Sequence, residues 1–253
     1  MKIGLVQYNP IWELKEENKK KIIRLIERDF QKSSFLIFPE MTLTGFTMMA
    51  EKFGESLKEN SFKYFSDIAL KYQTFIAAGL IEHDNGNYFN SLILLNPDGE
   101  LISKYRKIHP FSYSSEDKHY QKGEEIKIAE INGLKIGLSI CYDLRFPELF
   151  RFYAKGKVHL IIVIANWPHT RIEHWRTLLK ARAIENQCYV AGVNRVGDDP
   201  DLHYTGFSSI YDPMGNEIIS LINEEKIVFA DINKQNVKEI RKNLPFLDDI
   251  NLI

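Results

Sequence analysis

Three side chains with complementary chemistry each come near the end of a strand-like run. Cys141 follows the apolar residues Ile136–Ile140, Glu40 closely follows Phe35–Phe38, and Lys107 ends a basic strand before an aromatic loop. Ligands of open α/β sheets bind where strands end, so these groups are candidates for one site. A thiol can attack a carbonyl carbon, a carboxylate can carry the proton, and an ammonium can stabilise the oxyanion. Together they are chemically sufficient to cleave an amide.

Cys141 is expected where a strand gives way to a helix. Pro147 suits the first turn of that helix, and apolar residues recur at helical spacing as far as Tyr153. Backbone N–H groups at a helix start favour a thiolate, which is the nucleophilic form of cysteine. The alternative is that Cys141 is a small buried hydrophobe, the role expected of Cys188 beside the strand that begins at Tyr189.

Glu40 and Lys107 also have ordinary structural alternatives. A carboxylate at a strand end is half desolvated and can accept a proton near neutral pH, but Glu40 could equally cap a helix or form a salt bridge. Lys107 has two equally basic neighbours, Lys104 and Arg106, and all three could form a solvated strand edge. The residue types alone therefore leave both roles open.

Composition narrows the class of protein. The chain has 253 residues, of which 44% are hydrophobic and 26% charged, and its net charge is −1. This balance gives no basic face for nucleic acid, and no apolar run is long enough to cross a membrane. Two cysteines make no disulfide framework, and the N-terminus enters a strand without a signal-peptide pattern. We expect a cytoplasmic protein without nucleic-acid or membrane partners.

Strands and helices alternate along the chain. Strands are expected at 3–8, 35–38, 74–81, 136–140, 160–164, 189–194, 204–211, 217–221 and 228–232, with helices around 22–30, 62–72, 146–153 and 174–187 and at the C-terminus. Turn sequences at 84–87, 96–99 and 212–216 join antiparallel pairs. No linker or composition shift divides the chain. We predict an α/β fold of two sheets packed face to face, with helices outside, in a single domain spanning residues 1–253.

Three segments together resemble the signature motifs of the nitrilase superfamily of carbon–nitrogen hydrolases. They are Phe38-Pro39-Glu40, Tyr105-Arg106-Lys107-Ile108-His109 and Ile140-Cys141-Tyr142-Asp143-Leu144-Arg145-Phe146-Pro147-Glu148, in the family's order. Matching segments at 165–168, 181–186 and 212–215 extend the likeness over almost the whole chain. The resemblance implies a four-layer αββα sandwich of two mixed sheets, a homodimer, and neither a metal nor an organic cofactor. It also implies a second glutamate that positions the lysine; Glu116 is the candidate, with Asp117 and Glu124 as alternatives.

Within that superfamily the chain resembles the omega-amidase branch, whose substrates are short dicarboxylate monoamides such as 2-oxoglutaramate or succinamate. The backbone N–H of Tyr142 is then expected to donate to the oxyanion beside Lys107. Arg145 suits the distant substrate carboxylate because its planar fork binds carboxylates through two hydrogen bonds. It could instead brace the turn through Asp143 or Glu148. Trp167 is expected either to line the substrate pocket or to close the core.

Other interpretations remain at this point. His109 or His203 could pair with Cys141 in a cysteine–histidine hydrolase. His169 and His174 are five residues apart and miss the helical spacing of two metal ligands on one face, so no metal site is predicted. The chain could also be an N-carbamoyl or aliphatic amidase, or a ligand-binding module without catalysis, because fold does not fix function.

Overall fold

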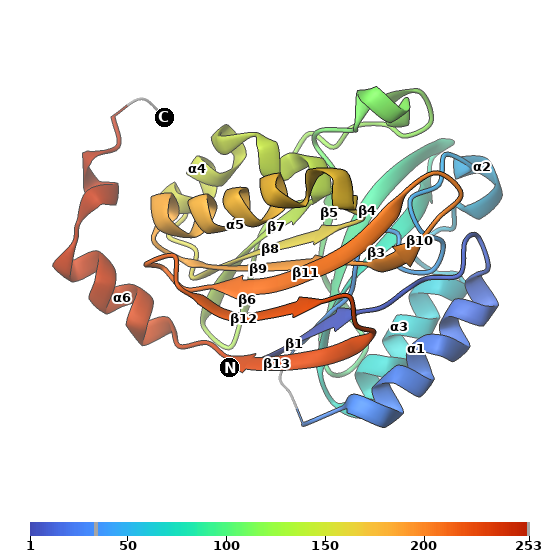
Figure 1. The fold of residues 1–253 in the computed structure, drawn as a ribbon, viewed down its shortest axis with the longest axis horizontal. Helices are drawn as coiled ribbons and strands as arrows, with labels where there is room; N and C mark the ends of the chain where they lie inside the picture. The colour runs from blue at the N-terminus through green and yellow to red at the C-terminus, as the bar shows by residue number, and fades with distance from the viewer. Residues whose placement is uncertain (33–34, 252–253) are drawn as a thin grey trace.

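Two mixed β-sheets lie face to face at the centre of the molecule (Figure 1). The computed structural model describes residues 1–32 and 35–251. The first sheet contains, in spatial order, β13 (Lys226–Asp231), β1 (Lys2–Gln7), β2 (Phe35–Ile37), β3 (Phe75–Asp84), β4 (Asn87–Leu95) and β5 (Leu101–Arg106). The second contains β10 (Val196–Asp198), β11 (His203–Tyr211), β9 (Tyr189–Asn194), β8 (Leu160–Ala165), β7 (Leu134–Ile140) and β6 (Ile128–Ile131), with β12 (Glu217–Ile222) paired to β11. The parallel strands, β1 to β3 and β7 to β9, are near-continuous apolar runs.

Helices cover the outer face of each sheet (Figure 1). The first sheet carries α1 (Lys15–Asp29) and α3 (Asn60–Tyr72), and the second carries α4 (Pro147–Lys155) and α5 (Ile172–Asn186). The remaining helical elements are α2 (Ala50–Phe53), α6 (Lys234–Asn243) and the 3₁₀ turns η1 (Ser112–Ser114), η2 (Glu116–Lys118), η3 (Cys141–Arg145), η4 (His169–Arg171) and η5 (Phe246–Asp249). Among the described residues, no helix is both long and apolar enough to span a bilayer.

Three apolar clusters hold these layers together, because successive strand residues point to opposite faces of a sheet. Leu92 of β4 and Ile162 of β8 pack in the cluster between the two sheets. Their neighbours Ile93 and Val163 point outward and pack in the clusters beneath the helices of their own sheets. The layers therefore run helix, sheet, sheet, helix, which confirms the predicted αββα sandwich.

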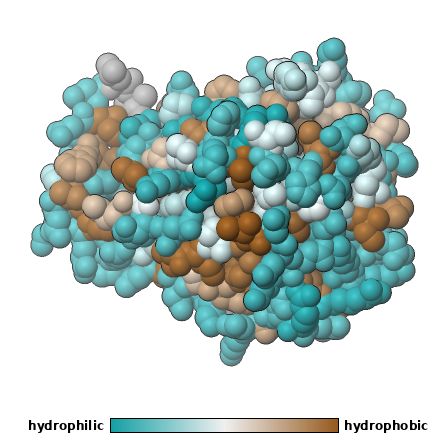
Figure 2. All heavy atoms as spheres, viewed as in Figure 1, coloured by the Kyte–Doolittle hydropathy of each residue, from teal (hydrophilic) through white to brown (hydrophobic). Residues whose placement is uncertain are grey.

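The surface in the same orientation is largely hydrophilic, with an apolar patch near the middle (Figure 2). The strand β12 carries two exposed isoleucines, Ile218 and Ile222, which are exposed by 42% and 49%. β12 lies at the margin of its sheet because it pairs only with β11. These exposed isoleucines therefore lie on a sheet edge, well separated along the chain from the three motif segments.

The expected order of elements is observed, with differences in short elements and at helix starts. The first helix, expected around 22–30, is α1 and begins earlier, at Lys15. The strand β6 was not predicted from the sequence, because four residues give too little alternation to separate it from a loop. It pairs with β7 across a turn in which Asn132 and Gly133 both have positive φ angles, of 51° and 75°. α5 begins at Ile172, two residues before the expected His174.

Candidate active site

The two sheets bring the three motif residues together. Glu40 and Lys107 leave β2 and β5 of the six-stranded sheet, whereas Cys141 leaves β7 of the other sheet. The Nζ atom of Lys107 lies 2.9 Å from Oε1 of Glu40. The Sγ atom of Cys141 is 3.9 Å from the backbone oxygen of Asn166, whose own N–H donates to Oε2 of Glu40 at 2.9 Å. The site therefore lies where strand ends of both sheets meet.

A second glutamate completes a buried cluster of charges. Lys107 Nζ lies 2.8 Å from Oε2 of Glu116, and the side chains of Glu40, Lys107 and Glu116 are at most 2% exposed. The backbone N–H of Phe111 also donates to Glu116, at 2.6 Å. Asp117 and Glu124, the two alternatives, are exposed. Of the three acidic residues that the sequence leaves open, the structure brings Glu116 to Lys107.

The neighbouring basic residues point to a different cluster. Lys104 pairs with Glu82 at 2.5 Å, and Arg106 pairs with Glu82 at 2.7 Å and with Asp84. Lys104 and Arg106 are two residues apart in β5 and point to the same face of the sheet. Lys107 is the next residue after the strand, and its side chain points away from that face. The structure thus separates Lys107 from Lys104 and Arg106, a distinction that the residue types alone did not provide.

The electrostatics of the cluster follow from burial and from its neighbours. Burial alone would lower the pKa of Lys107, but Glu116 and Glu40 outweigh it and hold that pKa above its ordinary value. Burial raises the pKa of Glu116, and the opposing effect of Lys107 does not cancel the rise. Lys107 therefore remains an ammonium ion at neutral pH.

The expectation of a thiolate at Cys141 is wrong. Burial and the charge of Glu40 raise the pKa of the Cys141 thiol, and Lys107 only partly opposes them. The helix expected after Cys141 begins at Pro147, as predicted, and a 3₁₀ turn separates it from the cysteine. Cys141 has a φ angle of 48° and opens the 3₁₀ turn η3, whereas α4 starts at Pro147. The resting residue is a neutral thiol that needs a base.

Two buried asparagines contact the carboxylates, and neither was predicted as a site residue. Nδ2 of Asn90 donates to Oε1 of Glu40 at 2.7 Å and to Oε1 of Glu116 at 2.8 Å. Nδ2 of Asn166 donates to the backbone oxygen of Glu40 at 2.8 Å. Asn90 could have been noticed as a polar residue within the buried apolar strand β4, where an amide needs a partner.

Asp143 ties the nucleophile turn to the segment around Lys107. Its carboxylate is fully buried and accepts hydrogen bonds from the N–H of Ile140 at 2.9 Å and the hydroxyl of Tyr105 at 2.7 Å. The backbone N–H of His109 also donates to it, at 3.0 Å. Asp143 is thus held by four groups when the ring of His109, whose Nδ1 lies 2.8 Å away, is included.

The histidines lie apart from the nucleophile. His109 stacks on the ring of Phe146, with centroids 3.8 Å apart, and His203 is exposed and pairs with Asp198 at 2.7 Å. The ring of each histidine is hydrogen-bonded to an aspartate and neither is hydrogen-bonded to Cys141, so the structure gives the cysteine–histidine alternative no support. Among the described residues, no group of three or more histidine, cysteine or acidic side chains is placed to hold a metal ion.

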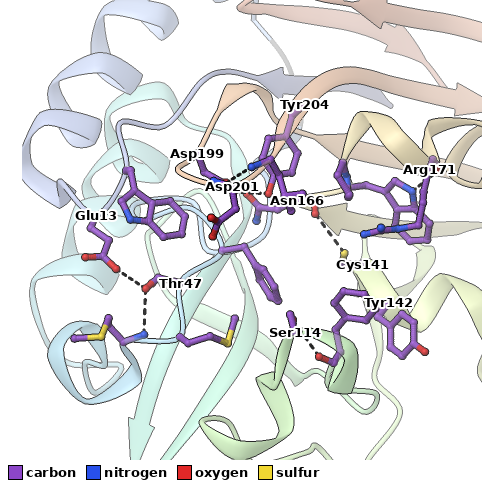
Figure 3. A pocket seen from close by; sticks show the side chains of 18 of the residues that line it. Glu13, Thr47, Ser114, Cys141, Tyr142, Asn166, Arg171, Asp199, Asp201 and Tyr204 are labelled. Carbon is purple, nitrogen blue, oxygen red and sulfur yellow. Dashed lines mark hydrogen bonds between the residues drawn. The ribbon is translucent and has the colours of Figure 1, made fainter.

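A cavity of about 370 Å³ opens in front of Cys141 (Figure 3). Tyr142, Arg145 and Trp167, the three residues proposed from the sequence to contact substrate, all line it. Trp167 also packs against Trp175 at 5.5 Å, so it both lines the pocket and closes the core. Tyr142 lies edge-on to Phe146, with ring centroids 5.1 Å apart.

Two arginines and three acidic residues line the cavity, the acidic ones being Glu13, Asp199 and Asp201. The guanidinium of Arg145 lies 4.8 Å from the ring of Trp167, and its Nη2 is 3.2 Å from Nδ1 of His174. It makes no ion pair with either acidic neighbour proposed to brace the turn. Arg171 also lines the cavity, whereas Glu13 lies on the far side with Thr47 (Figure 3).

The chain is similar to characterised and solved proteins over nearly its whole length. Residues 2–242 match the model of the carbon–nitrogen hydrolase family. The 2-oxoglutaramate amidase of Bacillus subtilis (strain 168) is 34% identical, over 98% of this chain and 96% of that protein. Omega-amidase YafV of Escherichia coli (strain K12) is 33% identical, over 98% of this chain and 96% of that protein.

The same likeness holds in three dimensions. XC1258 from Xanthomonas campestris, a CN-hydrolase superfamily protein solved with an arsenic adduct in its active site, superposes with a TM-score of 0.94. It is 31% identical, and the match covers 100% of this chain and 98% of that one. The resemblance found in the three motifs is therefore confirmed by family, sequence and fold alike. The chain belongs to the carbon–nitrogen hydrolase family.

Proposed function

We propose that the protein is a thiol-dependent amidase of the omega-amidase type. Its substrate is a short dicarboxylate monoamide, such as 2-oxoglutaramate or succinamate, and its products are the dicarboxylic acid and ammonia. The observation that carries this proposal is the placement of Cys141 between a buried Glu40–Lys107–Glu116 cluster and a cavity lined by two arginines. The similarity to a 2-oxoglutaramate amidase supports the choice of substrate.

In the first half-reaction the Cys141 sulfur attacks the amide carbonyl carbon while Glu40 takes the thiol proton. The raised pKa of that thiol makes a nearby base necessary at neutral pH. Collapse of the tetrahedral intermediate breaks the carbon–nitrogen bond, and the proton returns from the carboxyl group to the leaving ammonia. A thioester on Cys141 remains.

In the second half-reaction a water molecule attacks the thioester carbonyl, and Glu40 accepts one of its protons. The carbon–sulfur bond breaks, the thiol is protonated again, and the carboxylic acid leaves. Both tetrahedral intermediates carry an oxyanion, which we assign to Lys107 Nζ and the backbone N–H of Tyr142. Glu116 positions the ammonium by direct contact and aids protonation of the leaving group.

Ammonia release from a substrate panel tests this function. We expect hydrolysis of 2-oxoglutaramate and succinamate to exceed that of glutamine, a nitrile and an N-carbamoyl amino acid. Preference for the N-carbamoyl compound or for an uncharged amide would instead support one of the other amidase types. The absence of turnover on every compound would favour a ligand-binding module.

Arg145 is proposed to hold the substrate carboxylate. Arg145→Lys keeps the charge but loses the planar fork, so KM for succinamate should rise by about tenfold, as expected when one charged hydrogen bond is lost. Hydrolysis of propionamide, which has no carboxylate, should hardly change. Steady-state kinetics on the two substrates make the comparison. An equal loss on both would mean that Arg145 supports only the turn and the stack on Trp167.

We also propose that residues 1–253 act as one domain and form a homodimer in the cytoplasm. Both cysteines are free, which suits a reducing compartment. Phe152 of α4 and Ile184 of α5 are exposed by 46% and 48%, and their helices pack against each other, so they offer an apolar dimer surface.

Light scattering in solution measures the oligomeric state directly. We expect twice the chain mass of 29.5 kDa, and Ile184→Asp should shift the particle towards a single chain. Ile218→Asp, at a similarly exposed isoleucine on β12, is the matched control and should leave the mass unchanged. A dimer that survives Ile184→Asp but dissociates with Ile218→Asp would move the interface to the sheet edge.

A further inference from the structure

A closed ring of hydrogen bonds surrounds the two carboxylates of the site. Oε1 of Glu40 accepts from Asn90 Nδ2 at 2.7 Å and from Lys107 Nζ at 2.9 Å. Oε1 of Glu116 accepts from the same two nitrogens, at 2.8 Å and 3.1 Å. One neutral and one charged donor therefore bridge the same pair of oxygens.

We propose that Asn90 is a positioning residue for catalysis, which fixes the orientation of the Glu40 carboxylate so that its other oxygen serves the nucleophile. This inference rests on the amidase function proposed above. With Oε1 held by Asn90 and Lys107, only Oε2 is left to face the thiol. Oε2 is in turn held by the N–H of Asn166, the residue whose backbone oxygen contacts Cys141 Sγ.

The backbone of Asn90 supports the same arrangement. The N–H of Lys107 donates to the backbone oxygen of Asn90 at 2.8 Å, directly after the last β4–β5 pair, Ser91 with Arg106. One residue thus contacts Lys107 through its main chain and both carboxylates through its side chain. The β4–β5 pair and the residue after it thus carry both the ammonium and the amide that contacts the base.

The amide of Asn90 is used for donation alone. Its Oδ1 atom is buried and accepts no hydrogen bond from the described residues. Both partners of Nδ2 are carboxylate oxygens, which accept hydrogen bonds, so this end of the amide is the NH₂ group. A residue that places its two amide donors on two carboxylates of the site is suited to orient them.

A neutral donor also suits the charge of the ring. Two carboxylates and one ammonium already carry a net charge of −1 in a buried space. The other titratable groups that face the ring are Cys141 and Tyr120. The amide of Asn90 opposes the rise in the pKa of Glu116 without adding a charge. An acidic residue at this position would add a third carboxyl group to the buried cluster. An apolar residue would leave Lys107 as the one donor that joins the two Oε1 atoms.

Two substitutions should change the pH dependence in opposite directions. Asn90→Ala removes the neutral bridge and raises the pKa of Glu116 further, so its activity relative to the wild type should be lowest in acid and recover as pH rises. Asn90→Asp introduces a carboxyl group that donates one hydrogen bond only while protonated. Its relative activity should be highest in acid and fall as pH rises.

The measurement is the pH profile of kcat and of kcat/KM for succinamate. We expect Asn90→Ala to lower kcat by about 10- to 100-fold near neutral pH, the usual effect of losing hydrogen bonds to charged groups. KM should change less, because Asn90 does not line the cavity.

Ser91→Ala is the matched control, since Ser91 is the next residue of β4, is fully buried, and donates to the remote Glu82. Its profile should follow the wild type. Parallel profiles for Asn90→Ala, Asn90→Asp and the wild type would overturn the inference, as would an equal loss in Ser91→Ala. Failure of the proposed function is a separate result, because the wild type would then release no ammonia from succinamate.

Discussion

Cys141→Ala is expected to abolish amide hydrolysis, with a loss on the order of 10⁶-fold, as for other hydrolases that lose the nucleophile of an acyl-enzyme. The thermal unfolding midpoint should stay within about 5 °C, because the change removes one sulfur atom from a half-buried position beside the cavity. Ammonia release and differential scanning calorimetry on the same preparation measure both quantities.

The second cysteine of the chain provides the control for this experiment. Cys188 is fully buried, and burial raises its pKa to about 12, so Cys188→Ala should retain activity. Intact-mass analysis of a substrate-trapped sample should find one acyl group, on the peptide that carries Cys141. Hydrolysis by Cys141→Ala, or an acyl group on Cys188, would contradict the mechanism.

Lys107→Ala is expected to lower kcat by at least about 100- to 1,000-fold, the usual effect of losing one oxyanion donor. The effect should reach the thiol as well, since Lys107 lowers the pKa of Cys141 against burial and Glu40. Without the ammonium that pKa should rise further. Thiolate absorbance during a pH titration measures it independently of turnover.

Lys104→Ala separates the oxyanion role from a general effect of the basic strand. Lys104 is three residues away and pairs with Glu82, outside the site, so its removal should leave kcat nearly unchanged. Because Lys107→Ala leaves two buried carboxylates without their cation, its folded fraction is checked by circular dichroism. Equal losses in two folded variants would mean that the strand is structural and that Lys107 has no special role.

The strand-end residues of the site were predictable because the signal for them is local. An apolar run followed by a reactive side chain is visible within ten residues at Glu40 and Cys141, and the structure places both at strand ends. Lys107 follows a basic run, and only the motif resemblance distinguished it from Lys104 and Arg106. The choice of Glu116 was not decidable in this way. The loop after Lys107 has no periodicity, and only burial in the folded chain distinguishes Glu116 from its exposed neighbours.

The missed features depend on contacts between distant parts of the chain. Asn90 contacts Glu40 from 50 residues away, and Asn166 contacts it from 126 residues away. The prediction of a thiolate at Cys141 was wrong for the same reason. That prediction used only the residues that follow the cysteine in the chain. After burial, the largest effect on the pKa of Cys141 is the charge of Glu40, which comes from the other sheet.

The division of the site between two sheets has a consequence for how the native protein is recognised. Glu40 and Lys107 come from one sheet, and Cys141 and Asn166 come from the other. A collapsed folding intermediate with intact strands and helices but unfixed side-chain packing would have a nearly native far-ultraviolet spectrum. It would still lack the Glu40–Asn166 contact and have no catalysis. Recovery of enzymatic activity during refolding therefore reports the docking of the two sheets, a later event than the formation of either one.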